Sequence, residues 1–334
     1  LAGKIGDDTF ATNLLDVLSR RGLDKSMVQV PGEQTSYTIV LAPPGIDRIF
    51  LHCPGANDTF GAGDLNEDVL AKARHFHLGY PPLMKTLYKN DGEQLTEIFR
   101  RVKEKFPNVS TSLDMSLPDP NSESGKANWR KIVENTVPYV DLYLPSAEET
   151  LFMLERDKFL SLRDQARAEG KEMLDMITAR DVMDLSDQLL SMGAKIHTIK
   201  YGRRGFYVRS ASRDVVSKVP QLTEEQIDNW SGRELWHASY HVEKIGSATG
   251  SGDSSIAGFL SSYLRGLPIE EALTMANAVG GCNVTEMDAL TGIKSWEETQ
   301  AVINGWKNNK PRIEDAEWKE VVPGRLWAGP RDKS

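Results

Sequence analysis

The chain has 334 residues, of which 40% are hydrophobic and 26% charged, and its formal net charge is −8. This composition is typical of a globular protein, and the negative charge argues against a nucleic-acid-binding protein, which needs a basic face for phosphate contacts. No apolar run reaches the ~18 residues of a membrane span, and two cysteines, Cys53 and Cys282, are too few for a disulfide framework. We therefore expect a cytoplasmic protein that binds neither nucleic acid nor a membrane.

The N-terminal part of the chain predicts one helix and one hairpin. Asp8 or Thr9 can cap a helix that Gly22 ends. Two strand-like runs follow, at 36–41 and 48–52, and a Pro-Pro-Gly turn joins them. This hairpin interrupts the pattern of the remaining chain.

The rest of the chain alternates between strands and helices. The predicted strands are 75–78, 109–113, 142–144, 196–200 and 206–208. Helices such as 92–105 and 148–154 lie between most of them, which indicates a mostly parallel sheet covered on both faces. Residues 155–185 are charged and helix-prone, and we interpret them as a helical insertion. Residues 230–242, rich in aromatic side chains, fit either an extra β element or a buried plug.

The segment from Gly246 to Leu260 is rich in glycine and serine and runs into a predicted helix of small residues. Such a turn presents backbone N–H groups at a helix N-terminus, where the partial positive charge favours phosphate, and glycine lets the backbone approach closely. Asp253 inside this turn would lie beside a transferring phosphate and accept the proton of an attacking hydroxyl. The competing interpretation is an ordinary strand-to-helix turn with Asp253 as the N-cap.

This segment resembles the second signature of the ribokinase-like carbohydrate kinases, the phosphofructokinase B family, whose pattern is Asp-Thr-x-Gly-Ala-Gly-Asp. The residues that match its anion hole and its catalytic base are Gly250, Ser251, Gly252 and Asp253. The resemblance also implies that Thr249 contacts the nucleotide. Ser247 and Ala248 depart from the pattern, and Ser247 replaces an aspartate that usually helps to hold a monovalent cation. We therefore expect a weakened cation site.

Three further segments match nucleotide-binding motifs of the family in the family's order. The segment 145–149 resembles Asn-x-x-Glu, which organises magnesium and phosphates; Ser146 takes the place of the asparagine and Glu149 keeps the carboxylate that influences the metal. The segment 200–205 resembles the Gly-x-x-Gly turn that borders ATP. The residues implied there, and on the helix near the adenine, are Lys200, Gly202, Gly205 and Asn277.

Other segments match the substrate side of the family. Asp114 follows a predicted strand, as the Asp-x-Asn of many sugar kinases does. Arg48 and the segment 54–57, which ends at Asn57, match the family's lid hairpin, and we place the small β lid largely at 28–56. A homodimer formed through this lid is a further expectation. The opening residues 3–8 match Gly-x-x-Gly-x-Asp, so we expect the first strand of the family and its Gly-Gly-x-x-x-Asn motif to precede Leu1.

A better literal match to the signature lies at 58–64, Asp-Thr-Phe-Gly-Ala-Gly-Asp. It is followed by Leu-Asn-Glu-Asp, where the family has small residues that pack on the sheet, and it comes too early in the family's order. We interpret Asp64 with Glu67 as a capping box that starts an exposed helix. The segment 58–64 is therefore not expected to be the anion hole.

The resemblance spans nearly the whole chain and implies one domain over 1–334, a three-layer α/β/α sandwich with a small β lid. It implies ATP and Mg²⁺ as cofactors and transfer of the γ-phosphoryl group to a hydroxyl of a sugar or related polyol. Two alternatives stay open: a nucleoside kinase of the same fold, and a non-catalytic regulatory relative that binds a sugar or nucleotide. The departures from the family motifs, Ser146, Ser247 and Ala248, favour the second alternative.

Overall fold

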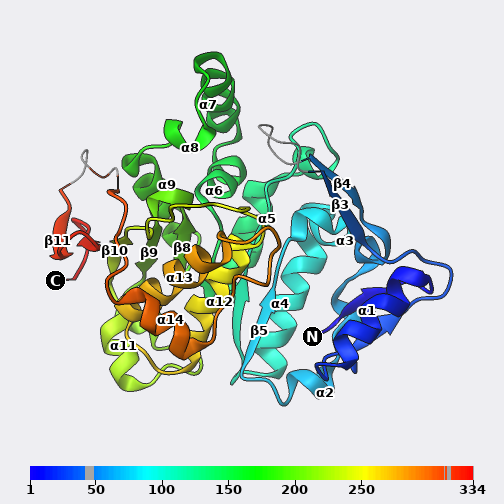
Figure 1. The fold of residues 1–334 in the computed structure, drawn as a ribbon. Coiled ribbons are helices and arrows are strands. Elements are labelled where there is room, and N and C mark those ends of the chain that lie inside the picture. The colour runs from blue at the N-terminus through cyan, green and yellow to red at the C-terminus, as the bar shows by residue number, and fades with distance from the viewer. Residues whose placement is uncertain (42–48, 312, 314–316, 334) are drawn as a thin grey trace. The chain divides into compact units, whose positions relative to one another are not determined.

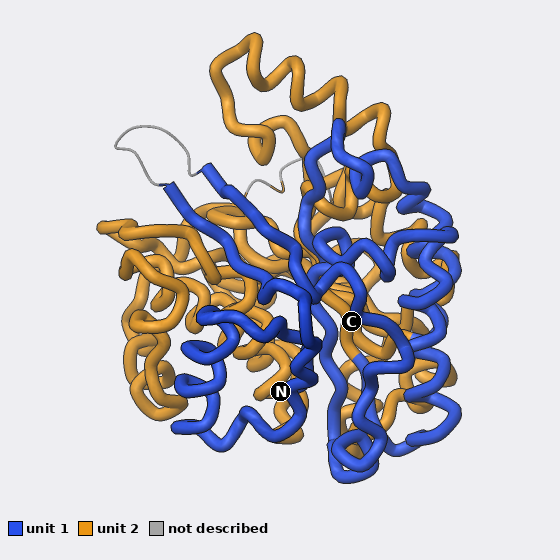
Figure 2. Tube along the Cα trace, turned by 90° about the vertical axis from the view of Figure 1, so that its right-hand side faces the viewer, with its two compact units in different colours: residues 1–111, 115–139 blue, residues 112–114, 140–334 orange. Residues whose placement is uncertain are grey.

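The computed structural model describes residues 1–41, 49–311, 313 and 317–333. The chain divides into two compact units, coloured in Figure 2: unit 1 comprises residues 1–111 and 115–139, and unit 2 comprises residues 112–114 and 140–334. Among the described helices none is long and apolar enough to span a membrane. The prediction of a single domain stays a prediction.

Unit 1 contains short strands and one long helix. Its elements are β1 (Gly3–Ile5), α1 (Thr9–Ser19), β2 (Met27–Gln29), β3 (Tyr37–Leu41), β4 (Ile49–Cys53), α2 (Glu67–Leu70), β5 (His75–Leu78), α3 (Lys85–Tyr88), α4 (Glu93–Lys105), the first half of β6 (Ser110–Leu113) and α5 (Trp129–Thr136). The Asp8 side chain accepts a hydrogen bond from Ala11 N and caps α1, which confirms the predicted helix start. The long helix α4 buries Leu95 and Phe99, one turn apart, in the core of the unit.

The predicted hairpin is present as β3 and β4, which pair antiparallel with Val40 opposite Phe50. The Pro43-Pro44-Gly45 turn and Arg48 lie outside the described residues. Successive side chains of a strand point to opposite faces, and apolar side chains on both faces of this hairpin are exposed. They are Ile39, Val40, Leu41, Ile49, Phe50 and Leu51.

Unit 2 holds most of the sheet and most of the helices (Figure 1). Its elements are β7 (Leu142–Tyr143), α6 (Ala147–Leu154), α7 (Arg156–Glu169), α8 (Met173–Met176), α9 (Ala179–Ser191), β8 (Ile196–Lys200), β9 (Phe206–Ser210), α10 (Arg213–Val216), α11 (Glu224–Trp230), β10 (Glu234–His237), α12 (Ser251–Leu264), α13 (Ile269–Asn283), α14 (Trp296–Ile303), β11 (Lys319–Val322) and β12 (Leu326–Ala328).

The strand order of the main sheet is β11-β12-β10-β9-β8-β7-β6-β5. Strands β6, β7 and β8 pair in parallel, whereas β9, β10, β12 and β11 extend the sheet through antiparallel pairings. Residues 230–242 therefore supply a sheet strand, β10, rather than a plug. The antiparallel strands β11 and β12 come from a C-terminal segment that the sequence patterns did not predict as strands.

Helices cover both faces of the unit 2 sheet. On one face Ile196 and Val208 pack in a core with residues of α12 and α13, among them Phe259 and Leu273. On the other face the next residue of β8, His197, forms a 2.8 Å hydrogen bond with Ser186 of α9. This alternation along β8 is what a strand buried on both faces requires.

The predicted insertion at 155–185 consists of α7, α8 and the start of α9, and α7 extends beyond the rest of unit 2 in Figure 1. Its short helix α8 packs on the turn between β8 and β9. There Arg203 pairs with Glu172 at 2.6 Å and with Asp175 at 2.5 Å, and Arg204 donates to Ile177 O at 2.9 Å. The insertion is therefore anchored to that turn.

The C-terminal segment closes over a buried carboxylate. Glu234 of β10 is fully buried and accepts hydrogen bonds from the Tyr207 hydroxyl at 3.0 Å and from Arg331 N at 2.9 Å. Asp332 accepts a hydrogen bond from Glu234 N at 2.8 Å. Trp318 lies edge-on to Trp236, with 5.7 Å between the ring centroids, and so anchors the tail to β10.

Candidate active site

The glycine-rich turn lies at the N-terminus of α12, as predicted. Gly250 is the N-cap, with φ of +75°, and a methyl group on it would lie 2.6 Å from Ala289 Cβ. Only glycine satisfies both the left-handed backbone and the close contact. Ser254 N donates to Gly250 O at 2.9 Å, so the intrahelical bonds begin there. Asp253 is exposed in the first helical turn and is not the N-cap, so the competing interpretation of this residue was wrong.

The turn before this helix is closed by Ser247. Its hydroxyl accepts a hydrogen bond from Thr249 N at 3.1 Å and donates to Thr249 Oγ1 at 2.9 Å. Gly246 N, in turn, donates to Val284 O at 2.8 Å, which ties the loop to the end of α13. Ser247 thus serves the loop itself, and its hydroxyl oxygen is already in use.

Lys200, the last residue of β8, forms a close ion pair with Asp114, which directly follows β6. Lys200 Nζ lies 2.5 Å from Asp114 Oδ1, and the two side chains are 12% and 2% exposed. Burial lowers the pKa of Lys200, but the carboxylates of Asp114, Glu149 and Asp253 raise it more, so that the pKa lies above its ordinary value. The ammonium group therefore stays charged among three carboxylates.

This ion pair lies against the glycine-rich turn. A methyl group on Gly252 would lie 3.8 Å from Lys200 Cε and 4.0 Å from Nζ. The sequence patterns placed Lys200 beside ATP and Asp114 beside the substrate, and they did not predict that the two side chains meet. The residues are 86 positions apart, and no local pattern carries that information.

Ser146 and Glu149 form a capping box at the N-terminus of α6. Glu149 Oε2 accepts from Ser146 N at 2.6 Å, and Ser146 Oγ accepts from Glu149 N at 3.3 Å. Lys200 N donates to Pro145 O at 2.9 Å, so this helix start adjoins the end of β8. Glu149 therefore lies near Lys200, and its carboxylate helps to raise the pKa of that lysine.

The turn at 200–205 is a 3₁₀ helix, Gly202–Arg204, between β8 and β9. Gly205 has φ of +106°, and a methyl group there would lie 2.0 Å from His237 O. Gly202, with φ of +50°, lies beside Leu174 of α8. The fold therefore requires glycine at 205, whatever ligand the turn borders.

Asn277 is largely buried on α13. Its side-chain amide donates to Leu273 O at 3.1 Å and lies 3.2 Å from His237 Nδ1. Burial lowers the pKa of His237 to about 4, so the imidazole is neutral at pH 7. Asn277 is held by its own helix and by β10, and its predicted place near an adenine stays a prediction.

Two sequence candidates lie in unit 1. Asn57 belongs to a 3₁₀ helix, Gly55–Thr59, that follows the hairpin, and it is partly exposed. In the second glycine-rich segment, Asp64 accepts from Gly61 N at 2.8 Å and pairs with Lys4 at 3.2 Å. The cap of α2 is Asn66, so the prediction that Asp64 starts this helix was wrong. The helix α2 spans only Glu67–Leu70, unlike the long α12 that follows Gly250.

Within the described residues no group of three or more His, Cys, Asp or Glu side chains is placed to hold a metal ion. Magnesium that accompanies a nucleotide needs fewer protein ligands, because it is held by one or two carboxylates together with phosphate oxygens. Glu149 fits such a role, with one carboxylate oxygen engaged in the capping box.

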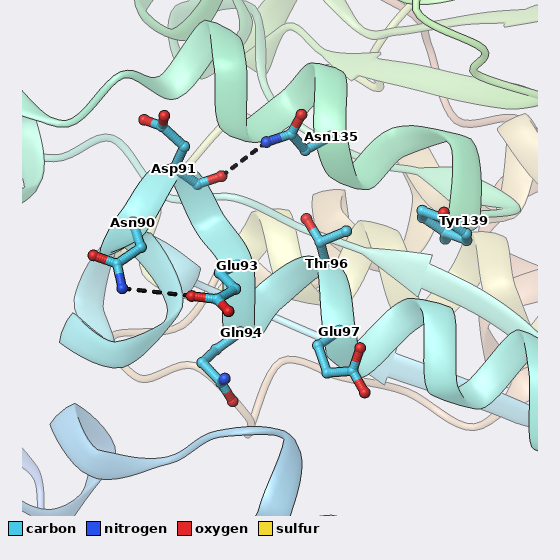
Figure 3. A pocket seen from close by; sticks show the side chains of 8 residues that line it. All are labelled: Asn90, Asp91, Glu93, Gln94, Thr96, Glu97, Asn135 and Tyr139. Carbon is cyan, nitrogen blue, oxygen red and sulfur yellow. Dashed lines mark hydrogen bonds between the residues drawn. The ribbon is translucent and has the colours of Figure 1, made fainter.

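A hollow of about 690 Å³ opens in unit 1 between α4, α5 and the turn before α4 (Figure 3). The side chains that line it are Asn90, Asp91, Glu93, Gln94, Thr96, Glu97, Asn135 and Tyr139. None of them is a predicted site residue. The charged members are all acidic, and a polyphosphate would be repelled there. We therefore do not assign the nucleotide to this hollow.

Comparison with known proteins identifies the family. The model of the pfkB family of carbohydrate kinases matches residues 1–296. The chain belongs to this family. The pfkB match covers both units and ends before the C-terminal segment that supplies β11 and β12.

The relatives of this pfkB chain are distant. An uncharacterised sugar kinase of Archaeoglobus fulgidus is 24% identical over 291 residues, which cover 87% of this chain and 93% of the relative. Probable fructokinase-7 of Arabidopsis thaliana is 22% identical, covering 92% of this chain and 78% of the relative.

The solved structures confirm the predicted fold. A putative ribokinase II of E. coli, in complex with ATP and Mg²⁺, aligns with a TM-score of 0.64 at 19% identity, covering 91% of this chain and 82% of that one. The ribokinase of Thermotoga maritima aligns at 0.60 and 17%, covering 91% and 80%. The mostly parallel ribokinase-like sheet, covered by helices and extended by further strands, is thus shared.

Proposed function

We propose that this protein transfers the γ-phosphoryl group of ATP to a hydroxyl of a sugar or related polyol, with Asp253 as the general base. The observation that carries the proposal is the position of Asp253, which is exposed in the first turn of α12 directly after the Gly250 cap. A base must be reachable by its substrate, and a helix start stabilises the negative charge of a phosphate.

Different residues of unit 2 have different roles in the proposed reaction. The backbone N–H groups of residues 250–253 stabilise charge on the transferring group, because those of a first helical turn lack intrahelical acceptors. Asp253 takes the proton of the attacking hydroxyl as the new oxygen–phosphorus bond forms, and the bond between the γ-phosphorus and the bridging oxygen breaks to release ADP. Glu149 would help to hold magnesium together with phosphate oxygens, and the metal would offset the negative charge of the phosphates. Most of the rate comes from positioning and electrostatics.

The named relatives support a sugar-type acceptor without choosing one. Besides fructokinases they include a 2-dehydro-3-deoxygluconokinase of Bacillus subtilis and an ATP-dependent ribose-1-phosphate kinase of Halopiger xanaduensis. These acceptors are polyhydroxylated, and identities of 20% and 25% do not select among them.

The test is ADP formation from ATP and Mg²⁺ across a panel of hexoses, pentoses, sugar acids, sugar phosphates and nucleosides. We expect turnover with one sugar or sugar derivative and loss of that turnover in Asp253→Asn. Turnover confined to nucleosides would make the protein a nucleoside kinase. ATP binding without turnover on any acceptor would support the non-catalytic alternative and overturn the proposal.

A further inference from the structure

The ammonium group of Lys200 pairs with Asp114, and this pair does not use all of its hydrogen-bonding capacity. The ammonium group has three hydrogens to donate. Within the described part of the chain, Asp114 Oδ1 is its only hydrogen-bond acceptor, at 2.5 Å. The side chain is 12% exposed, so Nζ is held at the edge of the protein interior rather than sealed inside it.

The surroundings of Lys200 point to a ligand that carries negative charge. The ammonium group lies 4.0 Å from the position that a methyl group on Gly252 would take, in the turn where α12 begins. Glycine at this position places no side chain between the ammonium group and the helix N-terminus. Two sources of positive potential, a lysine and a helix start, therefore act on the same space.

The charges around this space require such a cation. Asp114, Glu149 and Asp253 all act on Lys200, and they come from the end of β6, from α6 and from α12. Without Lys200 this cluster of three carboxylates would repel a polyphosphate. Lys200 is the positive charge that makes the site compatible with an anion before any metal arrives.

We propose that Lys200 donates hydrogen bonds directly to phosphate oxygens of the nucleotide and that Asp114 is the positioning residue that holds its ammonium group beside the first turn of α12. This inference rests on the proposed function for the identity of the nucleotide. The sequence patterns assigned Lys200 to the turn that borders ATP and Asp114 to the substrate. We now assign Lys200 to the phosphates of the nucleotide and Asp114 to the positioning of Lys200.

A second ion pair, at the opposite end of β8, provides the matched control. Lys195, just before β8, pairs with Asp141, just before β7, at 3.2 Å, and the two side chains are 12% and 0% exposed. Burial is therefore the same as for Lys200, but Lys195 precedes the strand that Lys200 ends. Its ammonium group also donates to Val140 O at 3.1 Å. Lys195→Met therefore measures the effect of losing a structural ion pair, and Lys200→Met should weaken ATP binding by more than that.

The experiment is calorimetric titration of ATP into wild type, Lys200→Met, Lys200→Arg and Lys195→Met, first in a metal chelator and then with Mg²⁺. Removing a charged hydrogen-bond donor from a phosphate should weaken ATP binding about tenfold or more. We expect this loss in Lys200→Met, a smaller one in Lys200→Arg, and a change of less than about twofold in Lys195→Met. The Mg²⁺ concentration for half-maximal ATP binding should rise in Lys200→Met only.

Lys200→Met removes the ion-pair partner of the buried Asp114 carboxylate, which can destabilise the protein. The double variant Lys200→Met/Asp114→Asn removes one charge of each sign, so it keeps the net charge of the cluster and leaves no carboxylate at position 114. We expect it to fold and still to bind ATP weakly, because the phosphate contact is missing. Wild-type affinity in this double variant would show that only net charge matters, and the inference would fail.

The binding readout keeps this inference separate from the proposed function. Lys200-dependent ATP binding in a protein that phosphorylates no acceptor would retain the inference and overturn the function. Turnover by a Lys200→Met enzyme with unchanged ATP affinity and Mg²⁺ dependence would do the reverse. A wild type that binds no ATP under either condition would overturn both.

Discussion

Gly205 packs directly on the backbone of His237, because a methyl group on Gly205 would lie 2.0 Å from the carbonyl oxygen of His237. This contact joins the turn after β8 to strand β10. It leaves no room for a side chain, and the φ of +106° is itself unfavourable for one.

Gly205→Ala should therefore lower the free energy of unfolding by about 3 kcal/mol or more, through backbone strain and steric clash together. The control is Gly324→Ala, where φ is +68° but nothing lies within 4 Å of the new methyl group. That change should cost only about 1 kcal/mol, the strain of a left-handed alanine. Urea unfolding measures both, and equal losses would contradict the predicted contact.

Asp253→Asn should lower turnover by ~10²-fold or more while ATP binding is largely retained, because the variant keeps its shape but loses the proton acceptor. Asp64→Asn, in the second glycine-rich segment, should change turnover by less than a few-fold. Its loss is limited to a hydrogen bond from Gly61 N and an ion pair with Lys4, together about 1 kcal/mol. A larger kinetic loss at Asp64 would reverse the assignment of the base.

Gly252→Val should weaken ATP binding in a folded protein. A methyl group at Gly252 meets Lys200 only at 3.8 Å, so the Cβ atom of the new side chain makes an ordinary contact and no clash. It fills the space where phosphate oxygens would approach the backbone. Gly63→Val, at a glycine with nothing within 4 Å, is the control and should leave ATP affinity unchanged. Equal ATP affinities of the two variants by calorimetry would place the phosphates elsewhere.

Activity should depend on Mg²⁺ but little on K⁺. Ser247 stands where the family signature has an aspartate, and its hydroxyl is engaged with Thr249. A neutral hydroxyl attracts a cation less than a carboxylate does. Replacing K⁺ by tetramethylammonium at constant ionic strength should change the rate less than a few-fold. A many-fold loss of rate would mean that backbone carbonyls form the cation site without the carboxylate.

The β3–β4 hairpin should mediate a homodimer, as the family resemblance implies. Ile39 and Phe50 are 50% and 52% exposed, and apolar side chains on both faces of a two-stranded hairpin need a partner. Light scattering at micromolar concentration should give the dimer mass for wild type and the monomer mass for Phe50→Lys. Met287→Lys, at another exposed apolar residue, is the control and should stay dimeric. A monomeric wild type would contradict the prediction.

Elements with a strong local pattern were predicted closely. The strands 75–78 and 196–200 agree with β5 and β8 to the residue. The cap of the first helix was narrowed to Asp8 or Thr9, and it is Asp8. Where two polar residues competed, as with Asp64 and Asn66, the nearer one to the helix was the cap, and a local pattern did not decide between them.

Long-range pairings lay beyond the reach of the sequence patterns. The glycine turn and Asp253 were found because the motif is contiguous, whereas the pair of Lys200 and Asp114 joins residues on different strands. In the same way β12 pairs with β10, with Leu235 opposite Ala328. The sequence pattern of a strand does not identify the strand that pairs with it. Neighbour relations in a sheet depend on topology, which is a property of the whole chain.

The closure of β10 by the C-terminal segment has a consequence for how the protein folds. Glu234 N donates a hydrogen bond to the side-chain carboxylate of Asp332, and the two residues are 98 positions apart in the sequence. Contacts between such distant segments form slowly, because the entropy of closing the loop is lost before the contact is gained. Until the tail arrives, β10 presents an open edge with an unshielded carboxylate, so early intermediates of unit 2 should be prone to aggregation and dependent on chaperones.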